Sequence, residues 1–299
     1  MLINYDKQIQ KIHDIRSGKI REGLGLGIPE IDKFIRYKPA NFNICLGHAN
    51  VGKTTVLLYL MLCYNLKHKK KWLVFSSENE SYSIIRKLVE FMNKETLHRI
   101  SEPKLARSTD YIKDNFKFIT NEKLYTYKDI LKVADKVKKD FQFDGIFIDP
   151  YNSLIKDNEL ISTLGGHEYD YQACTELRMF CKKKQVTIWV STHANTGALR
   201  VRHQIGHEFA GYPIPPLASD VEGGGKFVNR ADDFMVIHRY TQHPTEWVFN
   251  HIHIRKVKEI ETGGKPTIID QPIRLRAIVN NVGFTINGTD ILESIDRPF

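Results

Sequence analysis

The sequence predicts an α/β protein whose mostly parallel, twisted sheet has helices on both faces and an antiparallel extension at its C-terminal end. Short apolar runs typical of buried strands alternate with helix-like segments over residues 41–192, and this alternation is typical of a parallel sheet. Beyond residue 233 the pattern changes to strands and turns, which indicates an extension of the same sheet rather than a second domain. A glycine-rich loop joins the first predicted strand to the first core helix.

The segment before the sheet predicts two short helices separated by a flexible joint. Residues 4–19 form an amphipathic pattern, which would pack on its own domain or on a neighbouring subunit. Three isoleucines lie on one side of it among charged residues, namely Ile9, Ile12 and Ile15. A glycine-rich joint at residues 23–27 precedes a short helix begun by proline over residues 28–35. We therefore expect a linker helix within residues 1–22 and one large domain over residues 23–299.

Five apolar runs predict the main strands of the sheet, at residues 41–46, 72–75, 116–119, 145–149 and 186–192. Helices are predicted at residues 56–62, 81–92, 128–140 and 169–183. Residues 93–114 are interpreted as a polar region without a predicted element. The antiparallel strands of the extension are expected within residues 246–258 and 272–279.

The loop after the first strand reads GHANVGKTT over residues 47–55, and it fits the phosphate-binding pattern G-x-x-x-x-G-K-[ST] without a mismatch. Glycines let backbone N–H groups face phosphate oxygens, and the following helix adds the positive end of its dipole. Lys53 would reach the β and γ phosphates of ATP, and the hydroxyl of Thr54 would hold Mg²⁺. The predicted nucleotide contacts are Gly47, Asn50, Val51, Gly52, Lys53, Thr54 and Thr55. The alternative is an ordinary glycine-rich turn with an exposed lysine.

The composition is that of a globular chain with a basic balance. Of its 299 residues, 41% are hydrophobic and 26% are charged, and the net charge of +9 favours a polyanionic partner without identifying one. No apolar run reaches the length of a membrane span, and the N-terminus lacks a signal-peptide pattern. We therefore expect a cytoplasmic protein (in the host cytoplasm, if viral) with no membrane partner. The four cysteines form no C-x-x-C pair and are interpreted as reduced packing residues.

His251 and His253 lie two residues apart on a predicted strand, so both side chains would face the same side. Two histidines on one face are compatible with a metal site, but no third ligand is apparent in the sequence. We therefore expect this face of the strand to be solvated.

Three polar residues after predicted strands are candidates for nucleotide hydrolysis, which needs a carboxylate on the metal and usually a base for the attacking water. Asp149 ends an apolar strand at the edge where the phosphate loop lies, so it is the candidate metal carboxylate. Glu78 follows another strand and could polarise water, with Glu80 as its closest rival. His193 ends the fifth strand and could bond the γ-phosphate and sense its loss; the alternative is a solvent-facing loop histidine.

The long segment at residues 195–225 contains Arg200 and Arg202 and ends in three glycines before Lys226. Long loops in compact domains are usually functional or disordered. Cations and glycines at the edge of a sheet suit contacts to a phosphodiester backbone. We therefore interpret this segment as a candidate nucleic-acid contact, with a disordered surface loop as the alternative.

Taken together, these residues resemble the ATPase domain of the hexameric replicative DNA helicases, the DnaB, Twinkle and phage primase-helicase group within the RecA-like fold. The resemblance runs over roughly residues 24–279. GLGIPEID at residues 25–32 is similar to the family's lead-in to the phosphate loop. SSEN at residues 76–79 resembles the family's S-L-E-M motif, whose glutamate is the catalytic base, and this match favours Glu78 over Glu80.

Three further matches carry the resemblance. IFIDPY at residues 146–151 is similar to the family's Walker B strand, which places the metal-binding aspartate at Asp149. His193 stands where Twinkle-like members have a phosphate-sensing histidine and DnaB has a glutamine. LASDVEGGG at residues 217–225 resembles the segment next to the family's DNA-binding loop, which makes Lys226 and the preceding loop candidates for contacting single-stranded DNA.

The last match is HIRKVK at residues 253–258, which is similar to a K-x-R strand whose cations reach the γ-phosphate bound by the neighbouring subunit. Lys256 matches the family's lysine, but Lys258 occupies the arginine position, where it supplies charge without the planar fork. Arg255 is the alternative, although on an extended strand it points to the opposite face from Lys256. We therefore expect Lys256 and Lys258 to act together.

The resemblance implies a replicative DNA helicase motor that hydrolyses ATP with Mg²⁺ at the subunit interfaces of a homo-oligomeric ring, a hexamer in this family. Its partners would be single-stranded DNA, along which it translocates while unwinding duplex, and a primase or other replisome proteins. Two alternatives remain open. One is a RecA-type recombinase or KaiC-like signalling ATPase, and the other is a non-motor, ATP-gated protein that loads or binds a helicase.

Overall fold

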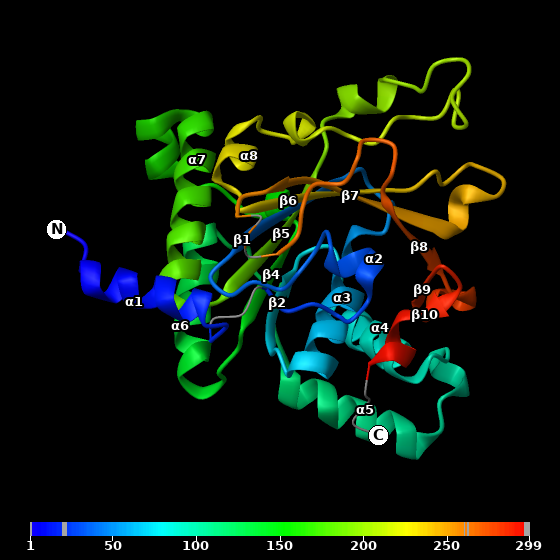
Figure 1. Ribbon diagram of the computed structural model, residues 1–299, viewed down its shortest axis with the longest axis horizontal. Helices are drawn as coiled ribbons and strands as arrows, with labels where there is room; N and C mark the ends of the chain where they lie inside the picture. The colour runs from blue at the N-terminus through cyan, green and yellow to red at the C-terminus, as the bar shows by residue number, and fades with distance from the viewer. Residues whose placement is uncertain (1, 20–22, 260, 262, 296–299) are drawn as a thin grey trace.

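The computed structural model describes residues 2–19, 23–259, 261 and 263–295, which form a ten-stranded sheet flanked by helices (Figure 1). The strand order is β10-β9-β8-β7-β6-β1-β5-β4-β2-β3. The strands from β3 to β6 in this order pair in parallel, and β7 to β10 pair antiparallel. Their bounds are β1 Phe42–Gly47, β2 Trp72–Ser76, β3 Phe116–Ile119, β4 Gly145–Asp149, β5 Thr187–His193, β6 Asp233–His238, β7 Phe249–Val257, β8 Ile273–Ala277, β9 Phe284–Ile286 and β10 Thr289–Asp290. The predicted parallel sheet with an antiparallel C-terminal extension is therefore confirmed.

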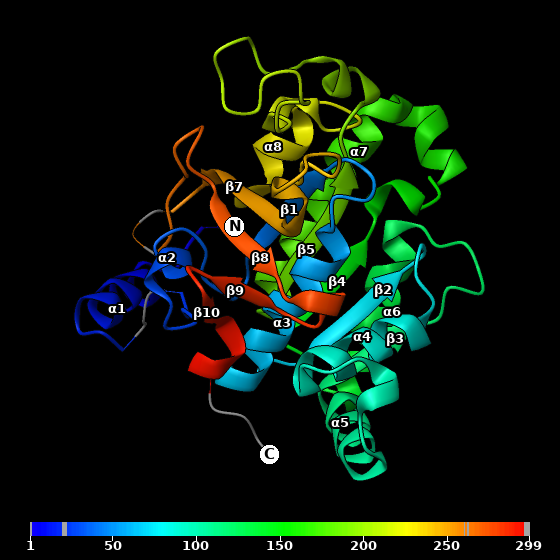
Figure 2. The same ribbon diagram turned by 90° about the vertical axis from the view of Figure 1, so that its right-hand side faces the viewer.

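Two layers of helices cover the sheet, as predicted. Helices α3 to α5 pack on one face and share one hydrophobic cluster with it, whereas α6 to α8 pack on the other face around a second cluster. Figure 1 and Figure 2 show the two layers on opposite sides of the strands. The helix bounds are α2 Pro29–Asp32, α3 Lys53–His68, α4 Ser81–Asn93, α5 Glu102–Asn115, α6 Tyr127–Asp140, α7 Asn158–Lys184 and α8 Lys226–Arg230.

Strand β4 illustrates why the central strands are apolar along their whole length. Ile146 and Ile148 belong to the cluster beneath α6 and α7, whereas Phe147 between them belongs to the cluster beneath α3 and α4. Because successive side chains point to opposite faces, a strand covered on both faces buries every residue. Strands β1, β2 and β4 are buried throughout, and this is why continuous apolar runs predicted them.

Two helices extend beyond the prediction. Helix α5 occupies residues 102–115, within the region interpreted as polar, and only Ser108 and Ile112 of it are buried. A helix that buries so narrow a stripe lacks the periodic apolar pattern by which helices are recognised. Helix α7 begins at Asn158, well before the predicted start, and Gly165, with φ 75°, breaks its first part from the rest.

Helix α1 Tyr5–Arg16 confirms the predicted N-terminal helix, and none of its residues is buried. Its isoleucines at positions 9, 12 and 15 are 47%, 63% and 60% exposed. Within the described chain it therefore does not pack its apolar side on its own domain, which was one of the two alternatives. Residues 1, 20–22, 260, 262 and 296–299 of the predicted domain ranges lie outside the described residues, and the division at residue 23 stays a prediction.

The expected solvated face of β7 is buried instead. His251 and His253 are 3% and 2% exposed, because the segment at residues 201–214 lies over this face. The ring of Phe209 from that segment is 5.9 Å from the ring of His251, and the ring of Tyr240 is 5.2 Å from it. Among the described residues no group of three or more metal-binding side chains is suited to hold a metal ion. Two alternating histidines predicted their shared face correctly, but the pattern could not reveal what covers it.

Two expectations from composition can be compared with the structure. All four cysteines are buried and free, which confirms their interpretation as reduced packing residues. None of the described helices combines the length and the apolar character that crossing a membrane requires.

Candidate active site

The phosphate loop connects β1 to α3, and its shape depends on residues in the left-handed conformation. Asn50 and Gly52 have φ angles of 61° and 89°. A Cβ atom on Gly52 would lie 2.8 Å from Nδ2 of Asn250, and one on Gly47 would lie 2.5 Å from the carbonyl oxygen of Ile237. Side chains at either glycine would collide with neighbouring groups, so packing as well as backbone conformation requires the two motif glycines.

Strand β7 and the motif lysine hold this loop in place. Asn250, buried on β7, donates a hydrogen bond of 2.7 Å to the carbonyl oxygen of Val51. Lys53 is 7% exposed, and its Nζ donates to the carbonyl oxygens of Gly47 and His48 at 3.0 and 2.8 Å. Desolvation by burial lowers the pKa of Lys53. The ammonium group is thus held against the loop that would receive phosphate.

A polar cavity of about 270 Å³ opens beside the loop. Thr54 and Thr55 at the start of α3 line one side of it, and Asn79 and Lys87 line another. Asn281, from the turn between β8 and β9, completes the lining that concerns the loop. The predicted contacts at Thr54 and Thr55 therefore border open, polar space.

Asp149, the last residue of β4, is 1% exposed, and three hydroxyl groups donate hydrogen bonds to its carboxylate. Thr54 donates to Oδ2 at 2.8 Å and Ser76 donates to the same oxygen at 3.4 Å, whereas Ser191 donates to Oδ1. Burial raises the pKa of Asp149, and the hydrogen bonds from Ser191 and Thr54 oppose this rise. Mg²⁺ prefers oxygen ligands and usually takes one or two from the protein, the rest coming from water and phosphate. The adjacent Thr54 hydroxyl and Asp149 carboxylate fit that donor set.

Glu78 and His193 lie together at the ends of β2 and β5. Nε2 of His193 is 3.2 Å from Oε1 of Glu78, and its Nδ1 is 3.4 Å from Nζ of Lys53. Because an ammonium group only donates, Nδ1 is the acceptor, which leaves the Nε2–H group to donate to Glu78. The side chain of Glu78 is 53% exposed, so water can reach it, as a general base requires. Glu80 instead lies at the N-cap of α4.

Solved structures with the same architecture include domains of replicative helicases. The ATPase domain of one replicative helicase superposes on this chain with a TM-score of 0.76 at 15% identity, covering 96% of this chain and 99% of that chain. The chain has the RecA-like fold of helicase ATPase domains. A DnaB-like replicative helicase, from a structure that describes its interactions with primase, gives a TM-score of 0.72 at 16% identity over 95% of this chain and 67% of that chain.

No family model and no curated protein matches this sequence. The likeness at 15% and 16% identity establishes the fold, and the resemblance expected from the sequence is confirmed at that level. The roles of individual residues on the RecA-like core therefore depend on their own geometry.

After β5, the RecA-like core carries an ordered hairpin at residues 201–214, closed by a backbone hydrogen bond of 3.0 Å from His203 to Tyr212. Arg200 and Arg202 are both exposed at its base. The guanidinium group of Arg202 also donates to a carbonyl oxygen within the hairpin at 2.6 Å. The two arginines are therefore accessible at the surface, as a backbone contact to DNA requires.

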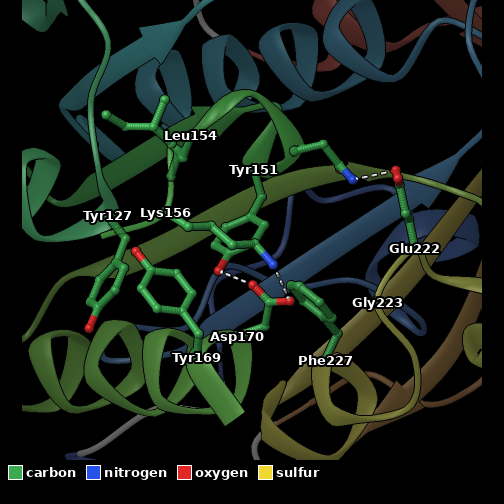
Figure 3. Close-up of a pocket in the computed structure, with 11 residues that line it drawn as sticks. Tyr127, Tyr151, Leu154, Lys156, Tyr169, Asp170, Glu222, Gly223 and Phe227 are labelled. Carbon is green, nitrogen blue, oxygen red and sulfur yellow. Dashed lines mark hydrogen bonds and ion pairs between the residues drawn. The ribbon is translucent and has the colours of Figure 1, made fainter. Parts of the chain in front are cut away.

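Lys226 lies in a different environment from these arginines. It is 5% exposed, and its Nζ is 3.5 Å from Oδ2 of Asp170 on α7. Asp170 also accepts hydrogen bonds of 3.0 Å from the hydroxyl of Tyr151 and from Nζ of Lys156 (Figure 3). Asp170, Tyr151 and Lys156 line a cavity of about 170 Å³ next to α7 and α8. Because the ammonium of Lys226 is buried and ion-paired, we no longer include it among the expected DNA contacts.

The candidate residues for action on a neighbouring subunit make contacts within their own chain. Nζ of Lys256 donates to the carbonyl oxygens of Val228 and Ala231 at 2.7 and 2.8 Å, where α8 ends. Nζ of Lys258 is 3.6 Å from Oδ1 of Asp232. Their action in an assembly stays a prediction.

Arg255 is the extra residue of a β-bulge, because Met235 pairs with Ile254 and Phe234 pairs with Lys256. Burial lowers the pKa of Arg255, and Asp270 is the nearby opposite charge that raises it. Its surroundings therefore differ from those of Lys256, which lies against the end of α8.

Sequence reasoning missed three polar side chains that hold the site. Asn250 holds the phosphate loop, and Ser76 and Ser191 hold Asp149 from the two neighbouring strands. The available signal was a polar residue at or near the end of a strand that is otherwise apolar. That signal is weak on its own, because many strand ends are polar.

Proposed function

We propose that this chain is an ATPase motor of the replicative-helicase type, which hydrolyses ATP with Mg²⁺ in order to translocate on single-stranded DNA and unwind duplex. The observation that carries the proposal is one row of contacts at the edge of the sheet. It runs from Lys53 through His193 to Glu78, directly beside the Thr54–Asp149 pair. These five side chains come from four strand ends or loops, and phosphate transfer to water needs this combination of groups.

Each residue has a distinct role in the proposal. Lys53 exchanges its bonds to loop carbonyl oxygens for bonds to the β and γ phosphates. Thr54 and Asp149 hold Mg²⁺, which neutralises charge that develops on the phosphate oxygens. Glu78 accepts a proton from the attacking water, and His193 bonds the γ-phosphate and changes partner when that phosphate leaves.

We place the ATP sites between the subunits of a homo-oligomeric ring, a hexamer in the family that the sequence resembles. Lys256 and Lys258 of one subunit would then stabilise the phosphoryl group transferred at the next, a contribution that can reach several powers of ten in rate. Arg200 and Arg202 would hold the backbone of single-stranded DNA, so sequence preference would be small. We further propose a cytoplasmic location and a primase or other replisome protein as a partner.

The proposal is tested by measuring ATP hydrolysis with and without an oligothymidylate, on a sample whose mass is determined by light scattering. We expect Mg²⁺-dependent turnover that rises when the oligonucleotide is present and an oligomeric mass under the assay conditions. Hydrolysis that is indifferent to DNA would contradict the motor, and no hydrolysis at all would contradict the ATPase.

One observation favours a second candidate, a non-motor protein that binds ATP and thereby controls its contact with a helicase. Lys256 and Lys258 both have partners within their own chain, so they are not free cations waiting for a neighbouring subunit. This candidate predicts ATP binding without turnover, in the presence and absence of DNA. The same assay therefore separates the two candidates.

A further inference from the structure

Asn152 belongs to a 3₁₀ turn, Tyr151–Ser153, directly after the Asp149–Pro150 end of β4. Its side chain contacts two different elements. Oδ1 accepts hydrogen bonds from Oγ1 of Thr192 at 2.7 Å and from the backbone N–H of His193 at 3.1 Å. Nδ2 donates a hydrogen bond of 2.6 Å to Oε2 of Glu222. One amide group thus joins the end of the strand that carries the candidate phosphate sensor to a segment about thirty residues further along.

The backbone of that segment is also paired with the end of β5. Ala194 and Val221 form an isolated antiparallel bridge, and the N–H group of Glu222 donates to the carbonyl oxygen of His193 at 3.0 Å. Glu222 is therefore held to His193 through its backbone and, by way of Asn152, through its side chain. A shift of His193 would displace Glu222 with it.

Three glycines follow Glu222, and they form the most adaptable part of this connection. Gly223 and Gly224 have φ angles of 98° and 90°, which only glycine adopts readily. A Cβ atom on Gly224 or Gly225 would meet nothing within 4 Å, so this backbone has open space around it. Glu222 is thus the fixed end of a glycine loop, residues 223–225, that can change conformation without collisions.

We propose that Asn152 is a positioning residue that couples the nucleotide site to the glycine loop. In this proposal, which rests on the proposed function, a change in the bonding of His193 at the γ-phosphate moves Glu222 through Asn152 and so reorients residues 223–225 toward single-stranded DNA. Thermodynamic linkage makes the effect reciprocal: DNA bound at the loop must strengthen or weaken nucleotide binding by the same factor.

The test uses the polarity of the Asn152–Glu222 hydrogen bond. Asn152→Asp keeps an oxygen acceptor for Thr192 and His193 but places a carboxylate against the carboxylate of Glu222, whereas Glu222→Gln keeps an acceptor for the Asn152 amide. The double variant, Asn152→Asp with Glu222→Gln, restores a hydrogen bond with donor and acceptor exchanged. Both side chains are exposed, so none of these changes removes a core contact.

Two quantities are measured in the full-length chain: the stimulation of ATP turnover by oligothymidylate, and the ratio of oligothymidylate affinities with and without a non-hydrolysable ATP analogue. Typical coupling between sites is about 5- to 150-fold. We expect Asn152→Asp to bring both ratios close to one while KM for ATP without DNA stays within about two-fold of wild type. Glu222→Gln should behave as wild type, and the double variant should recover both ratios.

Unchanged ratios in Asn152→Asp would overturn the coupling role while leaving the proposed motor intact. A loss that the double variant does not recover would also overturn it, because it would show that the Asn152–Glu222 bond is not the element that matters. If the wild-type chain neither hydrolyses ATP nor responds to DNA, the proposed function itself fails, and the coupling fails with it.

Discussion

Two neighbouring regions at one edge of the sheet accommodate buried polar groups in different ways. At the ends of β1, β2, β4 and β5, Lys53 and Asp149 are buried charges surrounded by hydrogen-bonding partners. At the end of β6 and along β7, His238 and His253 are buried with no ring nitrogen in a hydrogen bond of good geometry, although backbone groups of Pro213 and Ile269 lie near. The first region can hold charge, and the second can hold only neutral rings.

The titration behaviour follows this difference. Burial lowers the pKa of His238 to about 3, that of His251 to about 4 and that of His253 to about 2. These rings pack among aromatic side chains, with Phe209 stacked on Tyr240 at a centroid distance of 4.1 Å. The comparison teaches that partners, more than depth of burial, decide whether a buried group can stay ionised.

The largest expected effect comes from the nucleotide region, at the proposed base. Glu78→Gln removes proton acceptance while preserving shape, so we expect ATP turnover to fall about 10²- to 10⁴-fold. Binding of a fluorescent ATP analogue should be retained, because Glu78 contacts His193 rather than the phosphate loop. Glu80→Gln, at the N-cap of α4, is the matched control and should keep wild-type turnover. Equal losses in the two variants would remove Glu78 from the role of base.

The next effect concerns the phosphate loop itself. Lys53→Ala removes a charged hydrogen-bond donor from a buried position, so we expect ATP affinity to fall roughly 10- to 100-fold. Equilibrium titration with the same fluorescent analogue measures it. Unchanged affinity would refute the assignment of residues 47–55 as a nucleotide loop. Lys67→Ala, at the other end of α3, supplies the comparison for loss of a lysine from that helix.

Acid should weaken the histidine region. An unfolded histidine titrates near pH 6.5, above the folded pKa of about 2 for His253, so the unfolded chain binds the proton first. Stability is therefore fully present above about pH 6.5 and falls below it, by at most about 1.4 kcal/mol per pH unit for each such histidine. Urea unfolding at about pH 7.5 and about pH 5.5 measures this decline.

His253→Leu should make that decline shallower, because it removes one group that must stay neutral. His98→Gln, at an exposed position, is the control and should leave the decline as in wild type. A decline of the same size in His253→Leu and wild type would show that acid acts elsewhere in the molecule.

The smallest effect tests the contact between β7 and the phosphate loop. Asn250→Ala leaves the buried carbonyl oxygen of Val51 without its donor, so we expect a loss of about 1 kcal/mol in unfolding free energy. Urea unfolding at neutral pH measures it, with the exposed Asn229→Ala as control. A loss no larger than that of the control would indicate that water replaces the missing amide.

The parts of this molecule that sequence could predict are those with local causes. The phosphate loop is a contiguous motif, and β4 is a continuous apolar run because helices cover both of its faces. The meeting of Glu78 with His193 was expected only because parallel strands end at one edge. Their direct contact and the tautomer it implies required the coordinates.

The rest depends on contacts between distant segments, which no local pattern encodes. Asn250 reaches Val51 from 199 positions away in the chain. The burial of His251 depends on the separate hairpin that carries Phe209. Helix α5 was missed for a different reason, since a helix with so few buried residues has little apolar periodicity to detect.

The hydrogen bonds that Lys53 makes to its own loop have a consequence for what the loop accepts. Any incoming molecule must displace two carbonyl oxygens from the ammonium group. Adenosine brings no anionic oxygen to that exchange, whereas inorganic tripolyphosphate brings several, and charged hydrogen bonds are stronger than neutral ones. The loop therefore discriminates first by the negative charge of a tail and only afterwards by the identity of the base attached to it.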